Sequence, residues 1–305
     1  MSGRALLRAG NSAQVGSHNS AAQSHSGERE VTLRSLIRDS FLSTHGLNKI
    51  LGELRIVPEI KELLGSGVYH GYGVQNGNNA PVMLIPGIAT GDYTFHLLKG
   101  WLGRNGYDVH TAEIMFNALH TGMMLDSLSA KLLEISEVTG QRVTLIGHSY
   151  GGVQAKLLSH RHPKLIDHVY LLGSPITGDV HVHPLIAPVV ATELVIASFS
   201  RSLRQGLNAL RGEPEHFVQL LRRPEVPTTS IYSETDGIVD PESCKRDDVE
   251  LVRVNGSHIG FIGNKHVFEF LAGALPRSVS NPGPSSAKGN VNGRIRKGHL
   301  ELVKS

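Results

Sequence analysis

The sequence contains a single cysteine, Cys244, among its 305 residues. One cysteine cannot form a disulfide within the chain, so packing and hydrogen bonds must hold the fold together. Scarce cysteine is typical of a reducing compartment, and we expect the protein in the cytoplasm. Residues 1–29 carry Arg and Ser but no acidic residue before Glu28, so an organelle-targeting segment is the alternative interpretation of this stretch.

Long hydrophobic runs are also missing. A membrane-spanning helix needs about 18 or more consecutive apolar residues. The longest candidate, PLIAPVVATELVIASF at 184–199, is shorter than that and contains Glu193. The N-terminus lacks the apolar core and the small-residue cleavage site of a secretory signal peptide. The sequence therefore predicts neither a membrane-spanning segment nor a signal peptide.

The charge balance does not favour a nucleic-acid partner. The formal net charge is only +3, and the basic excess gathers near the chain ends and between Arg201 and Arg223. Nucleic-acid-binding domains carry a concentrated basic patch, whereas this is a weak bias. We therefore expect no nucleic acid among the partners.

Two terminal stretches are predicted to be disordered tails. Residues 1–29 and 277–305 are rich in Ser, Gly, Asn and Pro, and the second is basic. They hold too little apolar surface to offset the entropy cost of ordering the chain. The region between them, residues 30–276, is long enough for one large domain with a well-buried core.

Inside this region, six short apolar segments alternate with amphipathic helices. The expected strands are 81–87, 107–113, 143–148, 169–174, 228–233 and 249–254. Several are uninterrupted apolar runs, as strands covered on both faces should be. The alternation predicts an α/β fold with a mostly parallel central sheet and helices on both faces. A helix over 124–139 is expected to end at Gly140.

Three further features concern the flanks of the sheet. Residues 31–64 are expected to form N-terminal helices with a break near Gly46 and a kink or restart at Pro58. Asn76-Gly77 is typical of a hairpin turn and predicts an antiparallel edge pair opening the sheet. Residues 176–227 separate two strands by far more than the usual loop of about 2–6 residues, so we expect a helical cap insertion there.

The stretch LIGHSYGG at 145–152 has the spacing of a nucleophile elbow, with Ser149 at its apex. Such an elbow needs a strand that ends on a sharp turn, small residues two positions before and after the nucleophile, and a helix directly behind it. The preceding VTLI segment, Gly147, Gly151 and the following GGVQAKLLSHRH segment supply these parts. We therefore interpret Ser149 as a candidate nucleophile.

A serine nucleophile requires a general base and a group that orients the base. In this arrangement the partners follow the serine in the order acid, then histidine. Asp236 lies in the loop after the expected strand 228–233, and His258 lies in the loop after the last strand. Glu234 and Asp240 compete for the acid role. Asp240 precedes a proline, however, and is typical of a helix N-cap.

The oxyanion of the reaction would be held by two backbone N–H groups. One is expected from Tyr150, directly after the nucleophile, and the other from Ile88, in the loop after the first central strand.

Together these segments resemble the α/β-hydrolase superfamily and, within it, the bacterial lipase-like esterases. The resemblance rests on VMLIPG, VTLIGHSYGG, VYLLGSPITG, SETDGIVDPESC and GSHIGFIGN, and it covers about residues 80–275. It implies hydrolysis of a carboxylic ester or thioester through an acyl-enzyme on Ser149, without a metal or an organic cofactor. The chain has Pro86-Gly87 where His-Gly is commoner in the superfamily, and segment 112–122 carries no substrate-side motif of the better-known lipases.

We therefore expect a serine esterase in which His258 takes the proton of Ser149 and Asp236 orients His258. The expected partner is a small-molecule acyl ester. The apolar stretch 184–199 would suit a lid or acyl pocket, a lipid substrate and transient contact of the cap with a membrane surface; the alternative is a cap helix packed on the core.

Other functions remain open from the sequence. An acyltransferase or thioesterase would use the same triad, and a non-catalytic binding module would keep only the fold. His181 and His183, one residue apart, would suit a metal hydrolase, but no third ligand stands at a telling spacing.

Overall fold

The computed structural model describes residues 51–117, 121–177 and 214–277. The expected tails, the break near Gly46, the apolar stretch 184–199 and the His181–His183 pair lie outside the described residues. Within the described ranges, no helix is both long enough and apolar enough to span a membrane.

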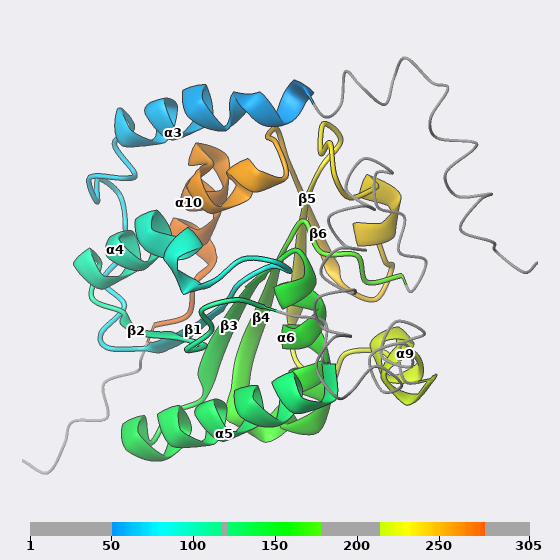
Figure 1. Ribbon diagram of the computed structural model, residues 1–305. Helices are drawn as coiled ribbons and strands as arrows, with labels where there is room; N and C mark the ends of the chain where they lie inside the picture. The colour runs from blue at the N-terminus through cyan, green and yellow to red at the C-terminus, as the bar shows by residue number, and fades with distance from the viewer. Residues whose placement is uncertain (1–50, 118–120, 178–213, 278–305) are drawn as a thin grey trace, which may run out of the picture.

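In the described part of the chain, six parallel strands form one sheet in the order β2-β1-β3-β4-β5-β6 (Figure 1). Their bounds are β1 Pro81–Ile85, β2 Asp108–Thr111, β3 Val143–His148, β4 Ile166–Leu172, β5 Thr228–Ser233 and β6 Glu250–Val254. All six strands expected from the sequence are confirmed. β1, β3 and most of β4 are buried, in keeping with their apolar runs.

The expected hairpin at Asn76-Gly77 is wrong, because no strand precedes β1 in the described part of the chain. The turn packs instead against the connection from helix α4, His96–Arg104, to β2. Gly77 N donates to Asn105 O at 2.8 Å, and Asn79 N donates to Gly106 O at 2.7 Å. A Cβ on Gly77 would lie 2.6 Å from the ring of Tyr107, so this close approach, rather than a hairpin, accounts for the glycine.

Helices cover both faces of the sheet. The α-helices within the described residues are α3 Ile56–Leu64, α4 His96–Arg104, α5 Thr121–Thr139, α6 Tyr150–Arg161, α9 Pro214–Leu221 and α10 Lys265–Ala274. The short 3₁₀ helices are η1 Gly52–Arg55, η2 Asp92–Phe95, η3 Pro163–Leu165, η4 Pro241–Cys244 and η5 Ile259–Gly263. The expected helix over 124–139 is confirmed as α5, and Gly140 follows it with φ of 65°. Of the expected cap insertion, α9 falls within the described residues.

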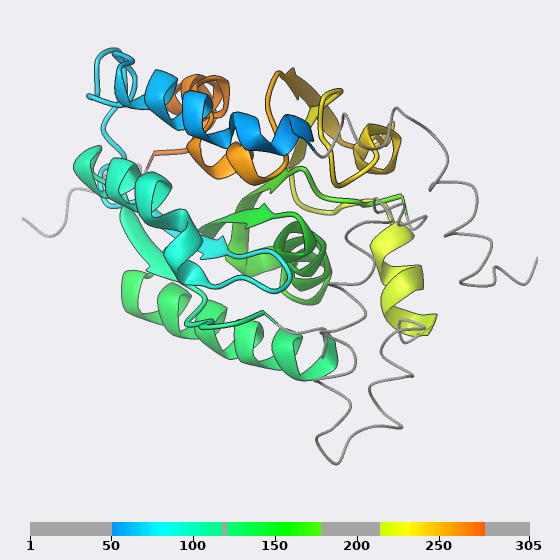
Figure 2. The same ribbon diagram turned by 45° about the horizontal axis from the view of Figure 1, so that its top comes forward.

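The core has two layers because successive strand residues face opposite ways. Met83 and Ile85 of β1 pack into the cluster that contains the buried residues of α5 and α6. Val82 and Leu84 pack into the cluster formed with α4 and α10. Figures 1 and 2 show α5 and α6 on one face and α3, α4 and α10 on the other. Pro58 lies in the first turn of α3, where its missing N–H costs nothing, so it marks a helix start.

The strand order changes direction at β1, which has β2 on one side and β3 on the other. In open parallel sheets a crevice forms outside the carboxyl ends of the strands at such a switch point, because the following loops diverge. The residues at this point are Pro86-Gly87 after β1 and Ser149 after β3.

Candidate active site

Ser149 occupies a sharp turn between β3 and α6. Its φ of 53° and ψ of −123° lie outside the regions that non-glycine residues normally adopt. The turn is tied to the neighbouring strand, since Ser149 N donates to Leu172 O at 2.8 Å. This geometry is the strained strand-to-helix turn that a nucleophile elbow requires.

The glycines around Ser149 permit a very close approach of backbone segments. A Cβ on Gly147 would lie 2.5 Å from Gly151 O, and a Cβ on Gly151 would overlap the carbonyl oxygens of Ile85 and Pro86. Gly87 also lies close to the turn, because its Cβ would stand 3.3 Å from Ser149 Cβ. The first turn of α6 can therefore sit directly against the end of β1.

Asp236 follows β5, His258 follows β6, and the structure brings their side chains together. His258 Nδ1 lies 2.7 Å from Asp236 Oδ2, and both side chains are buried. The other carboxylate oxygen of Asp236 accepts hydrogen bonds from Ile238 N and Val239 N, both at 2.8 Å. Asp236 is thus ordered by its own loop while one oxygen faces the imidazole.

The two competing acids bond elsewhere. Asp240 caps η4 and accepts a hydrogen bond from Glu242 N at 3.1 Å, as its position before a proline predicts. Glu234 pairs with Lys245 at 3.0 Å, and its side chain is 44% exposed. Of the three acids considered, only Asp236 contacts His258.

Ser149 and His258 share the same edge of the sheet. Among the described residues, no hydrogen bond joins Ser149 Oγ to the His258 ring. The link between them runs through His148, whose Nε2 lies 2.9 Å from His258 O and whose ring centroid is 5.0 Å from that of His258. Serine–histidine hydrogen bonds often tighten only once a substrate is bound.

His148 was not expected to take part in the site. Burial, followed by the neighbouring charge of His258, lowers its pKa to about 3. The ring is therefore neutral at ordinary pH, and because a carbonyl oxygen can only accept, Nε2 carries the ring proton and donates to His258 O. The feature of the sequence that could have identified His148 was its position directly before Ser149 in the elbow.

The loop that carries Ile88 is held by Asn117, another residue that the sequence did not single out. Asn117 Nδ2 donates to Pro86 O at 2.7 Å, and Ala89 N donates to Asn117 O at 2.9 Å. The two bonds lie on either side of Ile88, whose own amide makes no hydrogen bond with any described residue. Asn117 therefore restrains the loop on both sides of this amide.

Asn117 also joins this loop to α6. Its side-chain amide is paired with that of Gln154 by hydrogen bonds of 2.8 and 3.1 Å, and both residues are fully buried. Gln154 lies about one turn after Tyr150. The buried amide pair thus connects the two segments from which backbone donors were expected.

In the described part of the chain, no group of three or more His, Cys, Asp or Glu side chains is arranged to hold a metal ion. The chemistry that the described side chains can supply is that of a nucleophilic hydroxyl, an imidazole base and a buried carboxylate.

Comparisons with known proteins agree with this architecture. Residues 100–185 match a family model described as alpha/beta hydrolase. A triacylglycerol lipase of Vibrio cholerae is 30% identical over 138 residues, a match that covers 43% of this chain and 43% of the lipase. This chain therefore aligns with less than half the length of that relative.

Two solved structures are similar at low identity. An alpha/beta hydrolase from a sediment metagenome of the Mar Chica lagoon, Morocco, is 21% identical with a TM-score of 0.44, covering 64% of this chain and 89% of that one. Lipase B of Aspergillus fumigatus is 21% identical with a TM-score of 0.45, covering 67% of this chain and 54% of that one.

The parallel sheet, its switch point and the strand–turn–helix at Ser149 define an α/β-hydrolase fold. The family match over residues 100–185 and the partial alignment with a triacylglycerol lipase agree with this fold and show that the middle region of the chain is similar to α/β-hydrolases. The fold expected from the sequence is confirmed, and the expected resemblance to α/β-hydrolases is supported.

Proposed function

We propose that the protein is a serine hydrolase that cleaves a carboxylic ester through an acyl-enzyme on Ser149. His258 is the general base, and Asp236 orients it. The main support is the buried contact of 2.7 Å between His258 Nδ1 and Asp236 Oδ2, at the sheet edge where the strained turn of Ser149 lies. Order along the chain, loop placement and burial all agree with these roles.

The chemistry follows from the tautomer that Asp236 favours. A proton on Nδ1 directed at the carboxylate leaves Nε2 as the acceptor for the hydroxyl proton of Ser149. Oγ then attacks the ester carbonyl carbon, and the imidazolium returns the proton to the departing alcohol. Water activated by His258 next attacks the acyl carbon, which releases the acid and restores Ser149.

The negative charge that develops on the carbonyl oxygen needs fixed donors. The amides of Ile88 and Tyr150 suit this role, because one follows β1 and the other begins α6 at the switch point. The positive end of the α6 dipole points at the same place. Because the buried Asn117–Gln154 pair holds both segments, these donors need little rearrangement during the reaction.

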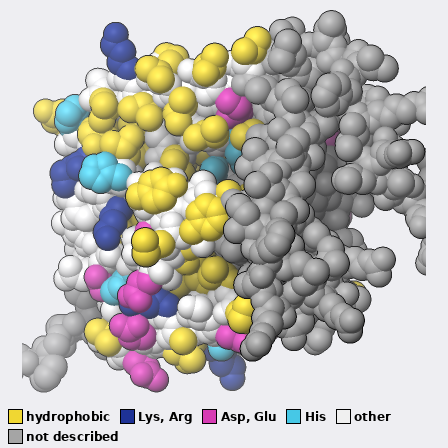
Figure 3. Space-filling view, viewed as in Figure 1, with side chains coloured by type: hydrophobic (Ala, Val, Ile, Leu, Met, Phe, Trp, Pro, Cys, Tyr) yellow, Lys and Arg dark blue, Asp and Glu magenta, His cyan; other side chains and the backbone are white. Residues whose placement is uncertain are grey.

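An apolar acyl ester is the substrate class that the surrounding surface favours. Met115 and Phe116, in the loop after β2, are 90% and 50% exposed. Tyr93, in the connection after β1, is 70% exposed. Figure 3 shows hydrophobic side chains gathered on the face turned to the viewer. Exposed apolar side chains in the connections that follow β1 and β2 suit acyl chains, and the relative in Vibrio cholerae is named a triacylglycerol lipase.

The test is hydrolysis of p-nitrophenyl esters of increasing acyl length by the wild type and Ser149→Ala. We expect turnover by the wild type and a loss of at least about 10³-fold in Ser149→Ala. A variant as active as the wild type would contradict the proposal. Ser149-dependent release of p-nitrophenol with the acyl group recovered on an added alcohol, rather than as free acid, would instead indicate an acyltransferase.

A further inference from the structure

The segment formed by η1 and α3 lies across the loops that follow β5 and β6 (Figure 1). Its residue Glu53 is buried, and its carboxylate reaches both loops. Glu53 Oε1 accepts hydrogen bonds from Gly237 N and His258 N, each at 2.9 Å. Its Oε2 accepts one from Ile259 N, also at 2.9 Å. One carboxylate thus binds three backbone amides on two loops.

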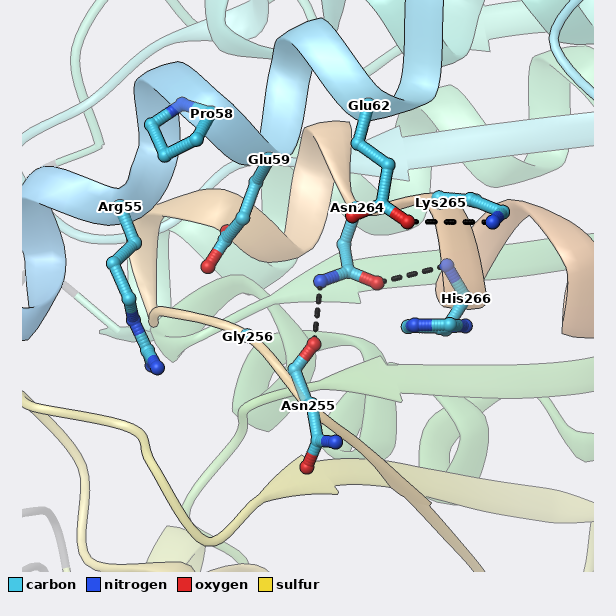
Figure 4. Close-up of a pocket in the computed structure, with 9 residues that line it drawn as sticks. All are labelled: Arg55, Pro58, Glu59, Glu62, Asn255, Gly256, Asn264, Lys265 and His266. Carbon is cyan, nitrogen blue, oxygen red and sulfur yellow. Dashed lines mark hydrogen bonds and ion pairs between the residues drawn. The ribbon is translucent and has the colours of Figure 1, made fainter. Parts of the chain in front are cut away.

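Glu59, two helical turns further along, continues this contact. Its Oε1 accepts a hydrogen bond from Ser257 N at 2.8 Å, and its Oε2 accepts one from Ser257 Oγ at 3.0 Å. A Cβ on Gly260 would overlap Glu59 Oε2, so the glycine makes room for the carboxylate. Figure 4 shows Glu59 pointing from α3 towards the backbone at Gly256.

The base of the histidine loop is closed separately by Asn264. Its Nδ2 donates to Asn255 O at 2.8 Å, and its Oδ1 accepts from His266 N at 2.9 Å (Figure 4). These bonds fix where the loop leaves β6 and enters α10. They do not touch the tip that carries His258, which is held by Glu53.

The carboxylates of Glu53 and Glu59 bind backbone amides that would otherwise lack partners. The amides of Ser257, His258 and Ile259 stand at the start of η5, where backbone N–H groups have no partner within the helix. Hydrogen bonds from amides to a carboxylate are stronger than those to a neutral acceptor. Gly237 directly follows Asp236, so Glu53 ties the backbone of the acid to the backbone of the base.

We propose that Glu53 is a positioning residue that sets the distance and orientation of His258 relative to Asp236. The proposal rests on the proposed function for its kinetic consequence, but the contact of His258 with Asp236 can be measured without any substrate. Displacing a catalytic group by about 1 Å can lower the rate by about 10²-fold.

The test compares Glu53→Gln and Glu53→Ala with Glu62→Gln as the matched control. Gln keeps the shape of the side chain but replaces one carboxylate oxygen by an NH2 group. If this group takes the place of Oε2, it cannot accept the hydrogen bond from Ile259 N. Glu62 lies on the same segment, is 56% exposed and, among the described residues, pairs only with Lys265. For Glu53→Gln we expect kcat to fall by about 10- to 100-fold with KM changed by less than about 3-fold, and a larger fall for Glu53→Ala. Glu62→Gln should match the wild type.

The second readout is the ¹⁵N spectrum of histidine-labelled protein, which reports the tautomer of His258. In the wild type and in Ser149→Ala we expect a fixed Nδ1–H tautomer, whereas Glu53→Gln should show exchange between the two tautomers. Wild-type kcat and a fixed tautomer in Glu53→Gln would overturn the proposal. So would a lower melting temperature and lower activity with the tautomer unchanged, since that indicates a general structural role.

The two readouts separate the proposals. If no ester is cleaved by the wild type, the proposed function fails, and the tautomer in Glu53→Gln alone decides the role of Glu53. If Glu53→Ala does not fold, the isosteric Glu53→Gln variant still gives both measurements.

Discussion

His258 Nδ1 lies 2.7 Å from Asp236 Oδ2, with both side chains buried, although the two residues stand in loops after different strands. The contact fixes the proton of the ring on Nδ1 and keeps Nε2 as an acceptor. It also shields the pair from competing water, so removing the charge of Asp236 should have a large kinetic effect.

Asp236→Asn should lower kcat by about 10³- to 10⁴-fold, because an amide can donate to Nδ1 and favours the wrong tautomer. Asp240→Asn is the matched control, since asparagine is also a good N-cap and η4 should persist. Ester hydrolysis under identical conditions checks both variants. A larger loss in Asp240→Asn would show that the acid was assigned to the wrong residue.

Asn117→Ala should lower kcat by about 10- to 100-fold, because the loop carrying the Ile88 amide loses its side-chain anchor at Pro86 O. It should also destabilise the fold by about 1–3 kcal/mol, since the buried amide of Gln154 loses its partner.

The control for this variant is Asn105→Ala. Asn105 Nδ2 also donates to a backbone carbonyl, Trp101 O at 2.8 Å, but at the end of α4. Chemical unfolding and steady-state kinetics of both variants separate the two effects. Equal kcat values for the Asn117 and Asn105 variants would mean that Asn117 does not position the oxyanion loop.

Two glycines within helices should respond in opposite ways to alanine. Gly151→Ala should destabilise the protein by at least about 1–3 kcal/mol, because the new Cβ would overlap backbone carbonyls at the end of β1. Gly103→Ala in α4 meets no atom within 4 Å and should stabilise the fold by about 0.5–1 kcal/mol. Melting temperatures measure both changes. A Gly151→Ala variant as stable as the wild type would rule out the close approach of α6 and β1.

Lys156 should make the free energy of unfolding rise as the pH increases through the alkaline range. Its Nζ donates to Leu220 O at 2.6 Å, which joins α6 to α9. Burial, followed by the charge of Arg246, lowers the pKa of Lys156 to about 8 from the usual 10.5. Between these two values the unfolded chain binds more protons than the folded one, so the free energy of unfolding rises with pH in this window.

The check is urea unfolding of the wild type and Lys156→Met at about pH 7 and about pH 10. We expect the wild type to gain stability relative to Lys156→Met as the pH rises. A constant difference between the two proteins at both pH values would contradict a depressed pKa.

The sequence predicted those elements correctly that depend on neighbouring residues alone. Uninterrupted apolar runs such as the one in β1 predicted strands correctly because strands buried on both faces are apolar along their whole length. The hairpin at Asn76-Gly77 was wrong because the turn packs against Tyr107, a tertiary contact that no dipeptide reveals.

Most of the proposed site could be read from the sequence because each candidate lies in the turn or loop after a strand, and the carboxyl ends of parallel strands meet at one edge. Glu53 and Asn117 could not be found in this way. Glu53 reaches His258 across 205 positions of the sequence, and no local pattern encodes such a hydrogen bond. Asn117 acts through Pro86 O, 31 positions away, by the same kind of contact.

The most direct test of the central claim is the reaction of the protein with a fluorophosphonate, in which Oγ of an activated serine displaces fluoride from phosphorus. Peptide mapping by mass spectrometry then locates the adduct. We predict one adduct per chain on Ser149, much slower labelling of His258→Ala, and none in Ser149→Ala. Labelling at another residue, or equal labelling of Ser149→Ala and the wild type, would contradict the assignment of Ser149 as the nucleophile.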